Sequence, residues 1–508
     1  MMQDINNENY TDADRLAEEF LIDGHIWDPS EELGADEAEL HPALQRHLSG
    51  SSFERGDFTL RFWRGDFYKW EAGRYYKVSD TEMKCTVKGF VNKCNQDARI
   101  YRDYADRYVS ITTAKIHNIL LCLAGTQGVH IPERNSLNSW LGQGQDCGGQ
   151  TLSFNNGLLI MEGESGQRKL IGHTPRYFSL TRLPYDYKPD ADCPKWRRFL
   201  SDVMESDDER IELLSQWAGY LLTPNNLRQK FLLMAGNGRN GKTVFSSILE
   251  RMVGLDNVSH VPLCQFSNQF ALTSTLGKVL NSSSESSGVL DKFAETTLKS
   301  FTSGDRMTFQ RKYKDPVHEF PTAKIMISTN QLPQFTDKSS GIWRRLLYVP
   351  FEKTIAEHLQ NPNLIEELSS ELGGIFNWAF EGLRKLMQAG RFTMPRKCSD
   401  AIDDYRRDVN PARAFLLDNY AAGFDYGGLP AQEVYDCYVR YCQDNGFRPM
   451  NSNNFGKEIK RTMPSVTKDR KRIGGQQVLI YSGMAVKEES EVAHNYGNIQ
   501  SEFRRNLY

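Results

Sequence analysis

The amino-acid sequence predicts an α/β protein built from several domains. The chain has 508 residues, and at roughly 150 residues per domain this length suggests three or four domains. Between residues 228 and 352, apolar segments with strand character alternate with amphipathic helical segments, an order that is typical of a layered α/β fold. Hydrophobic residues make up 39% and charged residues 25% of the chain, which excludes a disordered or collagen-like protein.

The first 50 residues form a strongly acidic segment. Residues 1–50 contain thirteen Asp or Glu residues and two Lys or Arg residues, a net charge of −11. The whole chain carries −3, so residues 51–508 carry +8. We expect a solvated, partly disordered arm, although such a segment can also imitate nucleic acid and compete for a basic groove.

Neither export nor membrane insertion is expected. The first residues lack the basic start and the apolar core of a signal peptide, and no run of about 20 apolar residues predicts a membrane span. The nine cysteines include no CxxC pair, which argues against a structural zinc site and favours the reducing environment of a cytoplasm.

Residues 51–190 are predicted to form a mixed N-terminal domain of the α+β type. Aromatic strands are expected near 58–63 and 67–70, a helix mainly over 84–123, and a strand pair around the Asn156–Gly157 turn signal.

A polar, proline-bounded connector at 185–194 is the expected end of this domain. Residues 191–227 after it are predicted to be helical, with Phe199, Val203 and Trp217 among the apolar positions.

A glycine-rich loop is the strongest motif in the sequence. It fits the pattern GxxxxGK[ST] at every fixed position, between an apolar strand and an amphipathic helix. Glycines let backbone N–H groups surround phosphate oxygens, and the start of a helix favours an anion. The residues predicted to bind ATP are Gly236, Asn237, Gly238, Arg239, Asn240, Gly241, Lys242 and Thr243.

Two side chains of this loop and one carboxylate further on are candidates for catalysis. Lys242 can reach the β and γ phosphates, and the Thr243 hydroxyl can ligate Mg²⁺. A strand candidate over 275–286 ends near Glu285, which could hold the same Mg²⁺ or orient an attacking water. Glu285 could equally be a solvated loop residue.

Residues 299–320 read as two strands joined by a basic bend. Arg311, Lys312 and Lys314 surround this bend, and a basic hairpin tip is suited to a phosphate backbone. The alternative is a charged surface turn.

Two further strands end or begin with polar residues. Asn330 ends the apolar segment 321–330 and could hydrogen-bond a γ-phosphate or its attacking water, or simply form a turn. Arg344 and Arg345 precede another apolar strand, and arginine can stabilise γ-phosphate charge from a neighbouring subunit. A structural ion pair is the alternative for these arginines.

Together these motifs resemble the superfamily 3 helicases, and the branch they are most similar to is that of the phage, plasmid and poxvirus primase-helicases. The segments that carry the resemblance are Gly236–Thr243, Ser283–Glu285, Ser303–Asp305, Arg311–Pro316, Ser328–Pro333 and Trp343–Arg345. The resemblance implies an AAA+ core with a helical extension over 228–400. It also implies a ring, usually a hexamer, with ATP and Mg²⁺ at subunit interfaces and 3′→5′ movement on single-stranded DNA. Such a protein would replicate a phage, plasmid or integrated element in a bacterial cytoplasm.

The same resemblance assigns roles to the candidate residues. Lys242 and Thr243 match the Walker A pair, and Glu285 matches the Walker B acid, although here serines flank it where many AAA+ proteins have a second acid. Asn330 matches the polar sensor. Arg345 is the expected arginine finger because it directly precedes the strand, with Arg344 as the alternative.

The regions before the core receive less specific roles from the resemblance. Residues 51–225 weakly resemble a helicase-associated domain, on the segments Asn155–Leu159 and Leu183–Tyr187. By position, the helices in 191–227 are expected to form an oligomerising collar. No constellation of carboxylates and histidine indicates a primase, so a separate primase or polymerase would have to be a partner.

Residues 401–485 are predicted to form a winged helix. One helix carries bases opposite its apolar side, and a strand of the following hairpin is also basic. A basic helix with a basic wing suits duplex DNA, although a solvated basic face is the alternative. The residues predicted to bind DNA here are Lys457, Lys460, Arg461, Lys468, Arg470, Lys471 and Arg472. Residues 486–508 are expected to be a polar tail.

Two functions of different classes therefore fit the sequence. The first is a ring-forming DNA helicase. The second is a P-loop ATPase that does not unwind DNA and acts as a loader, a nucleic-acid remodeller or an origin-bound scaffold. The basic hairpin before Asn330 favours the helicase.

Overall fold

The computed structural model divides the chain into two compact units. One contains residues 1–287, 291–331 and 344–395, and the other contains residues 288–290, 332–343 and 396–508. The second unit thus begins its main segment at Arg396, close to the expected domain start at residue 401. The residues that the structure describes are 12–27, 58–100, 108–133, 135, 137–141, 150–162, 167–284, 290–335, 340–423, 428–473 and 476–487.

A small antiparallel sheet and three helices begin the first unit. The sheet has the order β1-β2-β3, and apolar residues of the helices pack against it. The elements are α1 (Asp12–Gly24), β1 (Leu60–Trp63), β2 (Asp66–Glu71), β3 (Arg74–Val78), α4 (Asp80–Ile100) and α5 (Thr113–Gly125). Helix α1 lies in the acidic segment expected to be an arm, yet it buries Leu16, Phe20 and Leu21. That part of the segment is therefore folded, because its apolar stripe has a core to join.

The long helix expected over 84–123 is two helices, α4 and α5. Thr112 accepts a hydrogen bond from the backbone N–H of Lys115 and so starts α5 as its N-cap. A second antiparallel sheet of order β5-β6-β7 follows, with the Asn156–Gly157 turn between its first two strands. The strands of this part are β4 (Ser139–Trp140), β5 (Gln150–Phe154), β6 (Gly157–Glu162), β7 (Gln167–Ile171) and β8 (Tyr177–Phe178).

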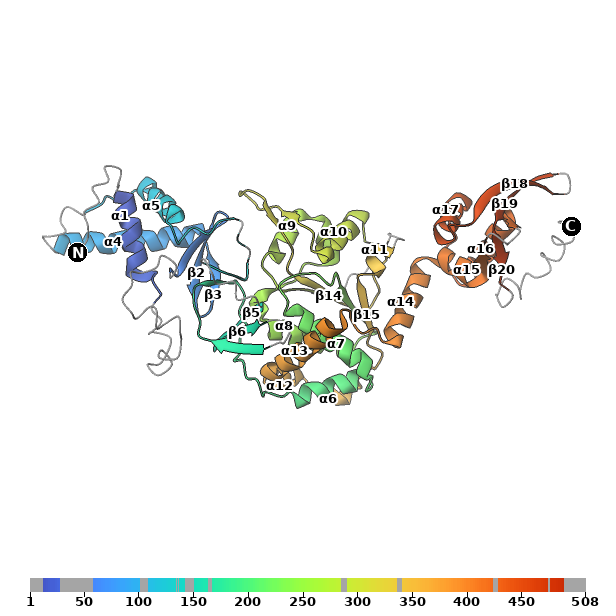
Figure 1. Cartoon of the computed structure of the whole chain (residues 1–508), viewed down its shortest axis with the longest axis horizontal. Helices are drawn as coiled ribbons and strands as arrows, with labels where there is room; N and C mark the ends of the chain where they lie inside the picture. Colours follow the sequence, from blue (N-terminus) through green and yellow to red (C-terminus); the bar gives the residue numbers. More distant parts are fainter. Residues whose placement is uncertain are drawn as a thin grey trace. The chain divides into compact units, whose positions relative to one another are not determined.

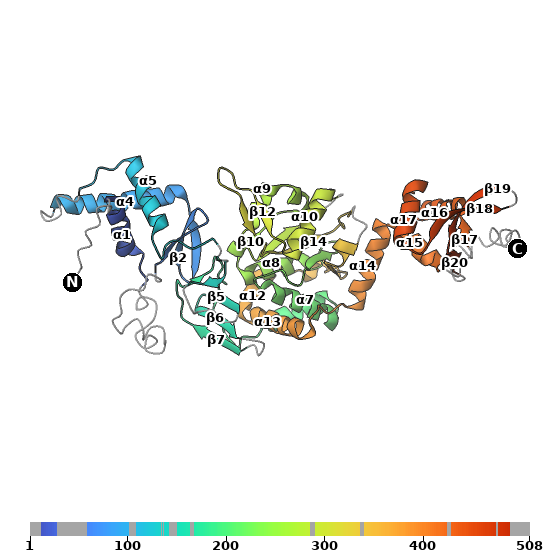
Figure 2. The ribbon, with the colours of Figure 1, turned by 45° about the horizontal axis from the view of Figure 1, so that its top comes forward.

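A five-stranded parallel sheet forms the centre of the first unit and confirms the predicted α/β class. Its order is β10-β11-β14-β9-β15, and every neighbouring pair is parallel. Helices α8, α7 and α13 lie on one side of the sheet, and α9 and α10 lie on the other (Figures 1 and 2). Because all strands are parallel, their carboxyl ends lie at the same edge of the sheet. Ligands of parallel α/β sheets bind at this edge.

The elements of this central layer are, in chain order, β9 (Phe231–Ala235), α8 (Lys242–Val253), β10 (Val258–Ser259), α9 (Gln269–Leu272), β11 (Leu280–Ser284), α10 (Lys292–Ser303), β12 (Met307–Phe309), β13 (Val317–Glu319), β14 (Lys324–Thr329), β15 (Leu346–Pro350), α12 (Leu364–Ser369) and α13 (Leu372–Ala389). Helix α11 (Ser340–Trp343) lies in the segment 332–343, which belongs to the second unit.

The helices expected to form a collar are built into this layer. Helices α6 (Pro194–Val203) and α7 (Asp208–Leu221) precede β9, and α7 is buried on nearly every side. Trp196 of α6 stacks on Phe245 of α8 with ring centroids 5.6 Å apart. Helices α7 and α13 touch closely at Gly219 and Gly382, because a Cβ atom at either glycine would overlap backbone of the other helix.

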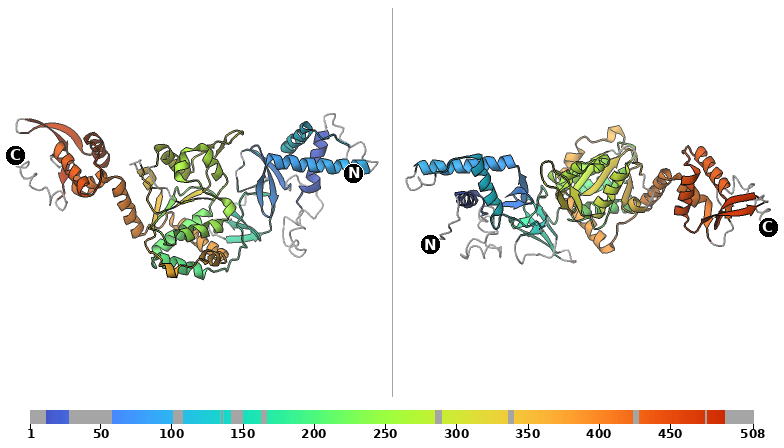
Figure 3. Two further views of the ribbon diagram at one scale, coloured as in Figure 1. Left: turned by 180° about the vertical axis from the view of Figure 1, so that it is seen from behind. Right: turned by 90° about the horizontal axis from the view of Figure 1, so that it is seen from above.

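The second unit contains three helices around one apolar core and a three-stranded antiparallel sheet of order β17-β19-β18 (Figure 3). Phe455, Tyr438 and Phe415 are central to this core. The elements are α14 (Arg396–Val409), α15 (Pro411–Asn419), β16 (Tyr420–Ala422), β17 (Gly428–Pro430), α16 (Ala431–Asp444), α17 (Ser452–Thr462), β18 (Thr467–Ile473), β19 (Gln476–Ser482) and β20 (Met484–Val486).

Among the helices that the structure describes, none is both long enough and apolar enough to cross a membrane.

Candidate functional site

The glycine-rich loop leaves the sheet at the carboxyl end of β9 and leads directly into α8. Gly238, Arg239 and Gly241 have φ angles of 91°, 51° and 87°, so the backbone turns through the left-handed region. Gly241 is the N-cap of α8 and offers no side-chain hydrogen bond, which leaves the first N–H groups of the helix without a capping side chain. Such N–H groups are suited to an anion.

Two glycines of this loop have no room for a side chain. A Cβ atom at Gly236 would overlap the Asn240 amide and the Phe351 carbonyl oxygen. A Cβ atom at Gly241 would lie 2.7 Å from Val203 Cγ1 of α6. At these two positions the backbone of the loop is therefore packed directly against neighbouring parts of the first unit.

Lys242 points back into the loop from the first turn of α8. Its Nζ atom donates to Gly236 O at 2.7 Å, to Asn240 Oδ1 at 3.0 Å and to Asn330 Oδ1 at 3.2 Å. The residue is only 5% exposed, and this burial lowers the pKa of its ammonium group below the usual range. Three oxygen acceptors keep the cation in place at the centre of the loop.

Asn330 directly follows β14, the neighbour of β9 in the sheet. The two strands are in register from Met326 beside Leu232 to Thr329 beside Ala235. Asn330 therefore reaches the loop from the next carboxyl end, and the structure brings it together with Lys242 as the sequence predicts.

The expected Mg²⁺ ligands are placed only in part. Thr243 is exposed on the first turn of α8, and Glu285 lies outside the described residues. Strand β11, which precedes Glu285, ends at Ser284 beside Ser328 of β14. Within the described residues, no group of three or more His, Cys, Asp or Glu side chains could hold a metal ion.

The two candidate finger arginines lie at the opposite edge of the sheet from the loop. Phe231, at the start of β9, donates its backbone N–H to Arg345 O at 2.9 Å, whereas the loop follows the end of that strand. The five residues of each strand separate the two edges by about 16 Å, at ~3.3 Å per residue. Within one chain these arginines therefore lie a strand length away from the loop.

The same two arginines differ in their surroundings. Arg345 is 7% exposed and donates to the Ser303 hydroxyl through Nε, at 3.2 Å, and through Nη2. Burial and the neighbouring Arg344 lower its pKa. Arg344 is exposed.

The predicted basic hairpin is formed by β12 and β13, which pair from Met307 beside Glu319 to Phe309 beside Val317. Its three bases are not equivalent. Lys312 is exposed, whereas Arg311 and Lys314 form ion pairs with Asp66 of β2 at 2.9 and 2.6 Å. The side chain of Asp66 is only 4% exposed.

The predicted basic surface of the second unit is exposed along α17 and β18. Alternation along β18 places Lys468, Arg470 and Arg472 on one face of the strand and Lys471 on the other. The ammonium group of Lys468 lies 5.9 Å from the centre of the Tyr481 ring. A Cβ atom at Gly456 of α17 would lie 3.8 Å from Lys468 Nζ, so helix and strand meet here. The exposed bases of α17 are Lys457, Lys460 and Arg461.

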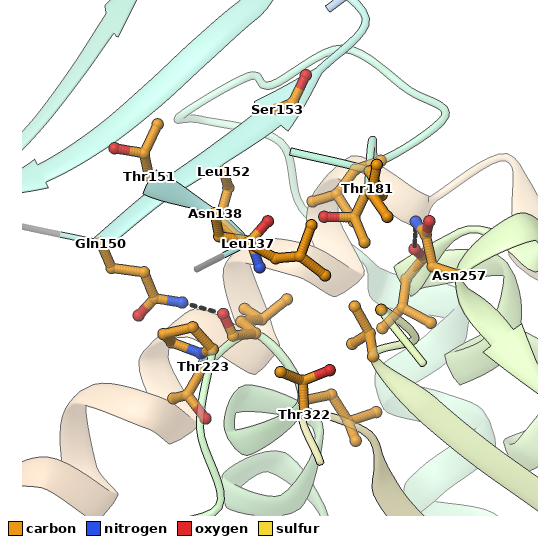
Figure 4. Close-up of a pocket in the computed structure, with 18 of the residues that line it drawn as sticks. Leu137, Asn138, Gln150, Thr151, Leu152, Ser153, Thr181, Thr223, Asn257 and Thr322 are labelled. Carbon is orange, nitrogen blue, oxygen red and sulfur yellow. Dashed lines mark hydrogen bonds between the residues drawn. The ribbon is translucent and has the colours of Figure 1, made fainter. Parts of the chain in front are cut away.

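A separate cavity of about 120 Å³ lies between the β5 strand and the central layer (Figure 4). Aliphatic side chains and uncharged polar groups such as Thr151, Thr181 and Asn257 line it. Gln150 crosses its edge and donates to the backbone oxygen of Leu222. No residue of the glycine-rich loop lines the cavity, and Lys278 is the single charged residue among its described lining. It is not a site for a triphosphate.

Two residues that sequence reasoning missed are buried and charged. Asp66 forms ion pairs with three basic side chains. Lys324, at the start of β14, donates a hydrogen bond to Thr223 O, and its ammonium group lies 5.2 Å from the centre of the Tyr220 ring. Burial lowers the pKa of Lys324 to about 7. Apart from Lys77, the partners of Asp66 and Lys324 lie about 100 or more positions away in the sequence, so no local pattern indicated that either residue is buried.

Comparisons with known proteins connect these features with viral helicases. A family of unknown function (DUF5906) matches residues 234–345, which include the loop, the hairpin and both arginines. The family "D5 N terminal like" matches residues 145–205, and the RFX DNA-binding domain matches residues 410–488.

Two curated viral proteins are similar over about half of the chain. The "Putative helicase L207/L206" of Acanthamoeba polyphaga mimivirus is 25% identical over 302 residues, which are 53% of this chain and 31% of that protein. The "Putative helicase 184R" of Invertebrate iridescent virus 6 is 23% identical over 284 residues, 48% of this chain and 29% of that protein. The matched region is thus about a third of each viral protein.

A solved structure supports the fold. The apo structure of the NrS-1 C-terminal region superposes with a TM-score of 0.50 at 12% identity, over 84% of this chain and 95% of that one. The motifs, the D5 match and the viral relatives agree with one another. The D5 match and the viral relatives support the resemblance of this chain to the superfamily 3 primase-helicases.

Proposed function

We propose that this protein is an ATP-dependent DNA helicase that drives replication of a phage, plasmid or integrated element. The observation that carries the proposal is the meeting of Lys242 and Asn330 at the mouth of a glycine-rich loop. The names of the viral relatives and the match to a DNA-binding domain support the same conclusion.

In this proposal the loop binds ATP together with Mg²⁺. The N–H groups of Gly236–Thr243 would hold the phosphates, and Lys242 would neutralise charge on the β and γ phosphates. Thr243 and Glu285 would hold Mg²⁺, which offsets negative charge on the phosphate oxygens when it is bound. Asn330 would accept or donate a hydrogen bond at the γ-phosphate or its attacking water.

The position of the arginines supports a ring with shared active sites. Arg344 and Arg345 lie at the sheet edge away from their own loop, so only a neighbouring subunit could use them for catalysis. The exposure of Arg344 favours it as the finger, because Arg345 is buried and hydrogen-bonded to Ser303. An AAA+ core in a ring, usually of six subunits, follows from the family.

Two basic surfaces are proposed to contact DNA. At the hairpin, exposed Lys312 would contact a single strand that moves in the 3′→5′ direction, as in the family. In the second unit, which we propose is a winged helix, the bases of α17 and β18 would contact a duplex. A separate primase or polymerase would act as a partner.

A forked-duplex assay tests the proposal. Substrates with a 3′ or a 5′ single-stranded arm separate a helicase from the alternative, a P-loop ATPase that loads, remodels or marks an origin. ATP-dependent strand release from the 3′-armed substrate supports the helicase. ATP hydrolysis without strand release on either substrate supports the alternative.

A further inference from the structure

The β12–β13 hairpin is tied to the sheet β1-β2-β3 through one buried carboxylate. Asp66 lies at the start of β2, and its side chain is 4% exposed. Its oxygens lie 2.9 Å from Lys77 Nζ, 2.9 Å from Arg311 Nη1 and 2.6 Å from Lys314 Nζ. Two of the three cations come from the hairpin and one from β3. We refer to these four residues as the Asp66 cluster.

Neighbouring contacts join the same two elements. Arg64, in the turn before β2, forms an ion pair with Glu319 of β13. Arg311 also donates to Arg64 O at 3.4 Å, and Lys314 lies 3.4 Å from Asp80 Oδ1 at the start of α4. The hairpin is therefore held at two places, at Glu319 of β13 and at the loop residues Arg311 and Lys314. The residues that these contacts join are about 240 positions apart in the sequence.

The buried ion pairs of Asp66 stabilise the contact between the hairpin and the sheet β1-β2-β3. Burial by itself would raise the pKa of the Asp66 carboxyl, but hydrogen bonds from Lys314 and Lys77 hold the pKa below its usual range. Separating a buried ion pair leaves an uncompensated charge, whereas a solvated contact with a phosphate returns little free energy. We therefore expect Arg311 and Lys314 to stay paired with Asp66 when DNA is present.

The tip of the hairpin has the opposite character. Lys312 is exposed, and Tyr313 is fully exposed, with a φ angle of 60°. An exposed tyrosine beside an exposed lysine can stack on a base while the lysine contacts a phosphate. Arg311 and Lys314, in the loop between β12 and β13, are thus held by Asp66, and Lys312 and Tyr313 between them are exposed to contact a strand.

We infer that Asp66 is a positioning residue: it joins the hairpin to the sheet β1-β2-β3, so that both move as one body when ATP hydrolysis drives the hairpin along DNA. This inference rests on the proposed helicase function. It gives Arg311 and Lys314 a role in holding the hairpin and leaves contact with DNA to Lys312 and Tyr313.

The first test measures the hairpin itself and does not depend on helicase activity. Hydrogen exchange of peptides covering residues 307–319 is compared in the full-length protein and in the Asp66→Asn and Asp66→Glu variants. Asp66→Asn removes the charge at constant size, and exchange should become at least tenfold faster. Asp66→Glu keeps the charge and should stay near the original protein. Unchanged exchange in Asp66→Asn would overturn the inference.

The second test separates positioning from DNA contact. Asp66→Asn should keep its DNA-free ATPase within twofold and lose at least tenfold in unwinding. Arg311→Met should lose unwinding equally, and the double variant should be no worse than either single variant, since all three break one connection. Lys312→Ala should instead weaken single-strand binding and reduce the slope of log affinity against log salt by about 0.7.

Each contrary result has a distinct meaning. If Arg311→Met reduces the salt slope as Lys312→Ala does, while Asp66→Asn unwinds normally, Arg311 contacts DNA and the inference is wrong. If the original protein does not unwind any fork, the proposed function fails, and the role of Asp66 in movement fails with it. The exchange measurement then still decides whether Asp66 holds the hairpin.

Discussion

The Nζ atom of Lys242 lies 3.2 Å from Oδ1 of Asn330, although 88 residues separate them in the sequence. The contact joins the first turn of α8 to the end of β14. It exists because β9 and β14 are parallel neighbours and their carboxyl ends share one edge. If the loop binds ATP as proposed, both residues can act on one phosphate group.

Replacing Lys242 and replacing Asn330 should affect ATP binding and ATP turnover differently. Lys242→Ala should lose both ATP binding and turnover, because the phosphates lose their main cation. Asn330→Ala should still bind ATP but hydrolyse it about 10²-fold more slowly, the usual loss for one orienting polar group. Binding of a fluorescent ATP analogue and release of phosphate distinguish these outcomes. Normal turnover by Lys242→Ala would exclude the loop as the catalytic site.

Substitutions of Arg344 and of Arg345 should also have different effects. Arg344→Ala should fold normally yet lose roughly 10³-fold or more in ATPase rate, because a finger acts on the neighbouring subunit's phosphate. Arg345→Ala should lower the free energy of unfolding by about 1–3 kcal/mol, since it removes a buried, hydrogen-bonded side chain. ATPase rates and melting temperatures of both variants check this.

Mixing two inactive variants tests whether the arginine of one subunit acts on the ATP bound by its neighbour. Arg344→Ala and Lys242→Ala subunits, each inactive alone, should recover activity when mixed, since some interfaces then carry an intact loop facing an intact arginine. Activity that never exceeds the two separate proteins would argue against a shared site.

The pH dependence of stability should depend on Lys324. Its folded pKa is about 7, well below that of an unfolded lysine, so between pH 7 and pH 10 the unfolded chain binds the extra proton. Stability should then rise with pH in this window, by up to about 1.4 kcal/mol per pH unit, and should not depend on this group below pH 7. Lys324→Met should remove that rise.

Thermal unfolding at pH 6.5, 8 and 9 measures this difference. The melting temperature of the original protein relative to Lys324→Met should increase from pH 6.5 to pH 9. Parallel curves for the two proteins would show that Lys324 titrates as it does in water.

The basic face of β18 offers a matched pair of variants. Arg470 and Lys471 are adjacent and exposed but point to opposite faces of the strand. If the face of Lys468, Arg470 and Arg472 contacts duplex DNA, Arg470→Ala should reduce the slope of log affinity against log salt by about 0.9. Lys471→Ala should leave it nearly unchanged, and equal slopes for both variants would indicate a solvated face.

Local sequence patterns predicted the loop, the sheet and the hairpin turns, because each depends on residues close together in the chain. The strands expected over 299–320 are shorter than predicted, because residues 299–303 belong to α10. The strand before Gly236, the helix after Lys242 and the turn at Gly157 all form as expected. Interactions between distant segments were not predictable in this way. Asp66 meets Arg311 across 245 residues, and neither composition nor periodicity indicates which acid a base will meet.

Burial explains the remaining differences. Residues 191–227 are expected to form a collar by their position, and nothing in that expectation indicates that Arg210 is fully buried and donates to Pro350 O at 3.0 Å. Likewise, the sequence favours Arg345 over Arg344 as the finger because Arg345 directly precedes the strand, and it does not indicate that Arg345 is buried against Ser303 while Arg344 is exposed.

Strand separation on a fork tests the central claim most directly. Purified full-length protein and Lys242→Ala are each incubated with ATP, Mg²⁺ and a fluorescent duplex carrying a 3′ single-stranded arm, and the released strand is measured over time. We expect ATP-dependent release by the original protein, little release from a 5′-armed duplex, and none by Lys242→Ala. Release that is equal in both proteins, or ATP hydrolysis without any release, would contradict it.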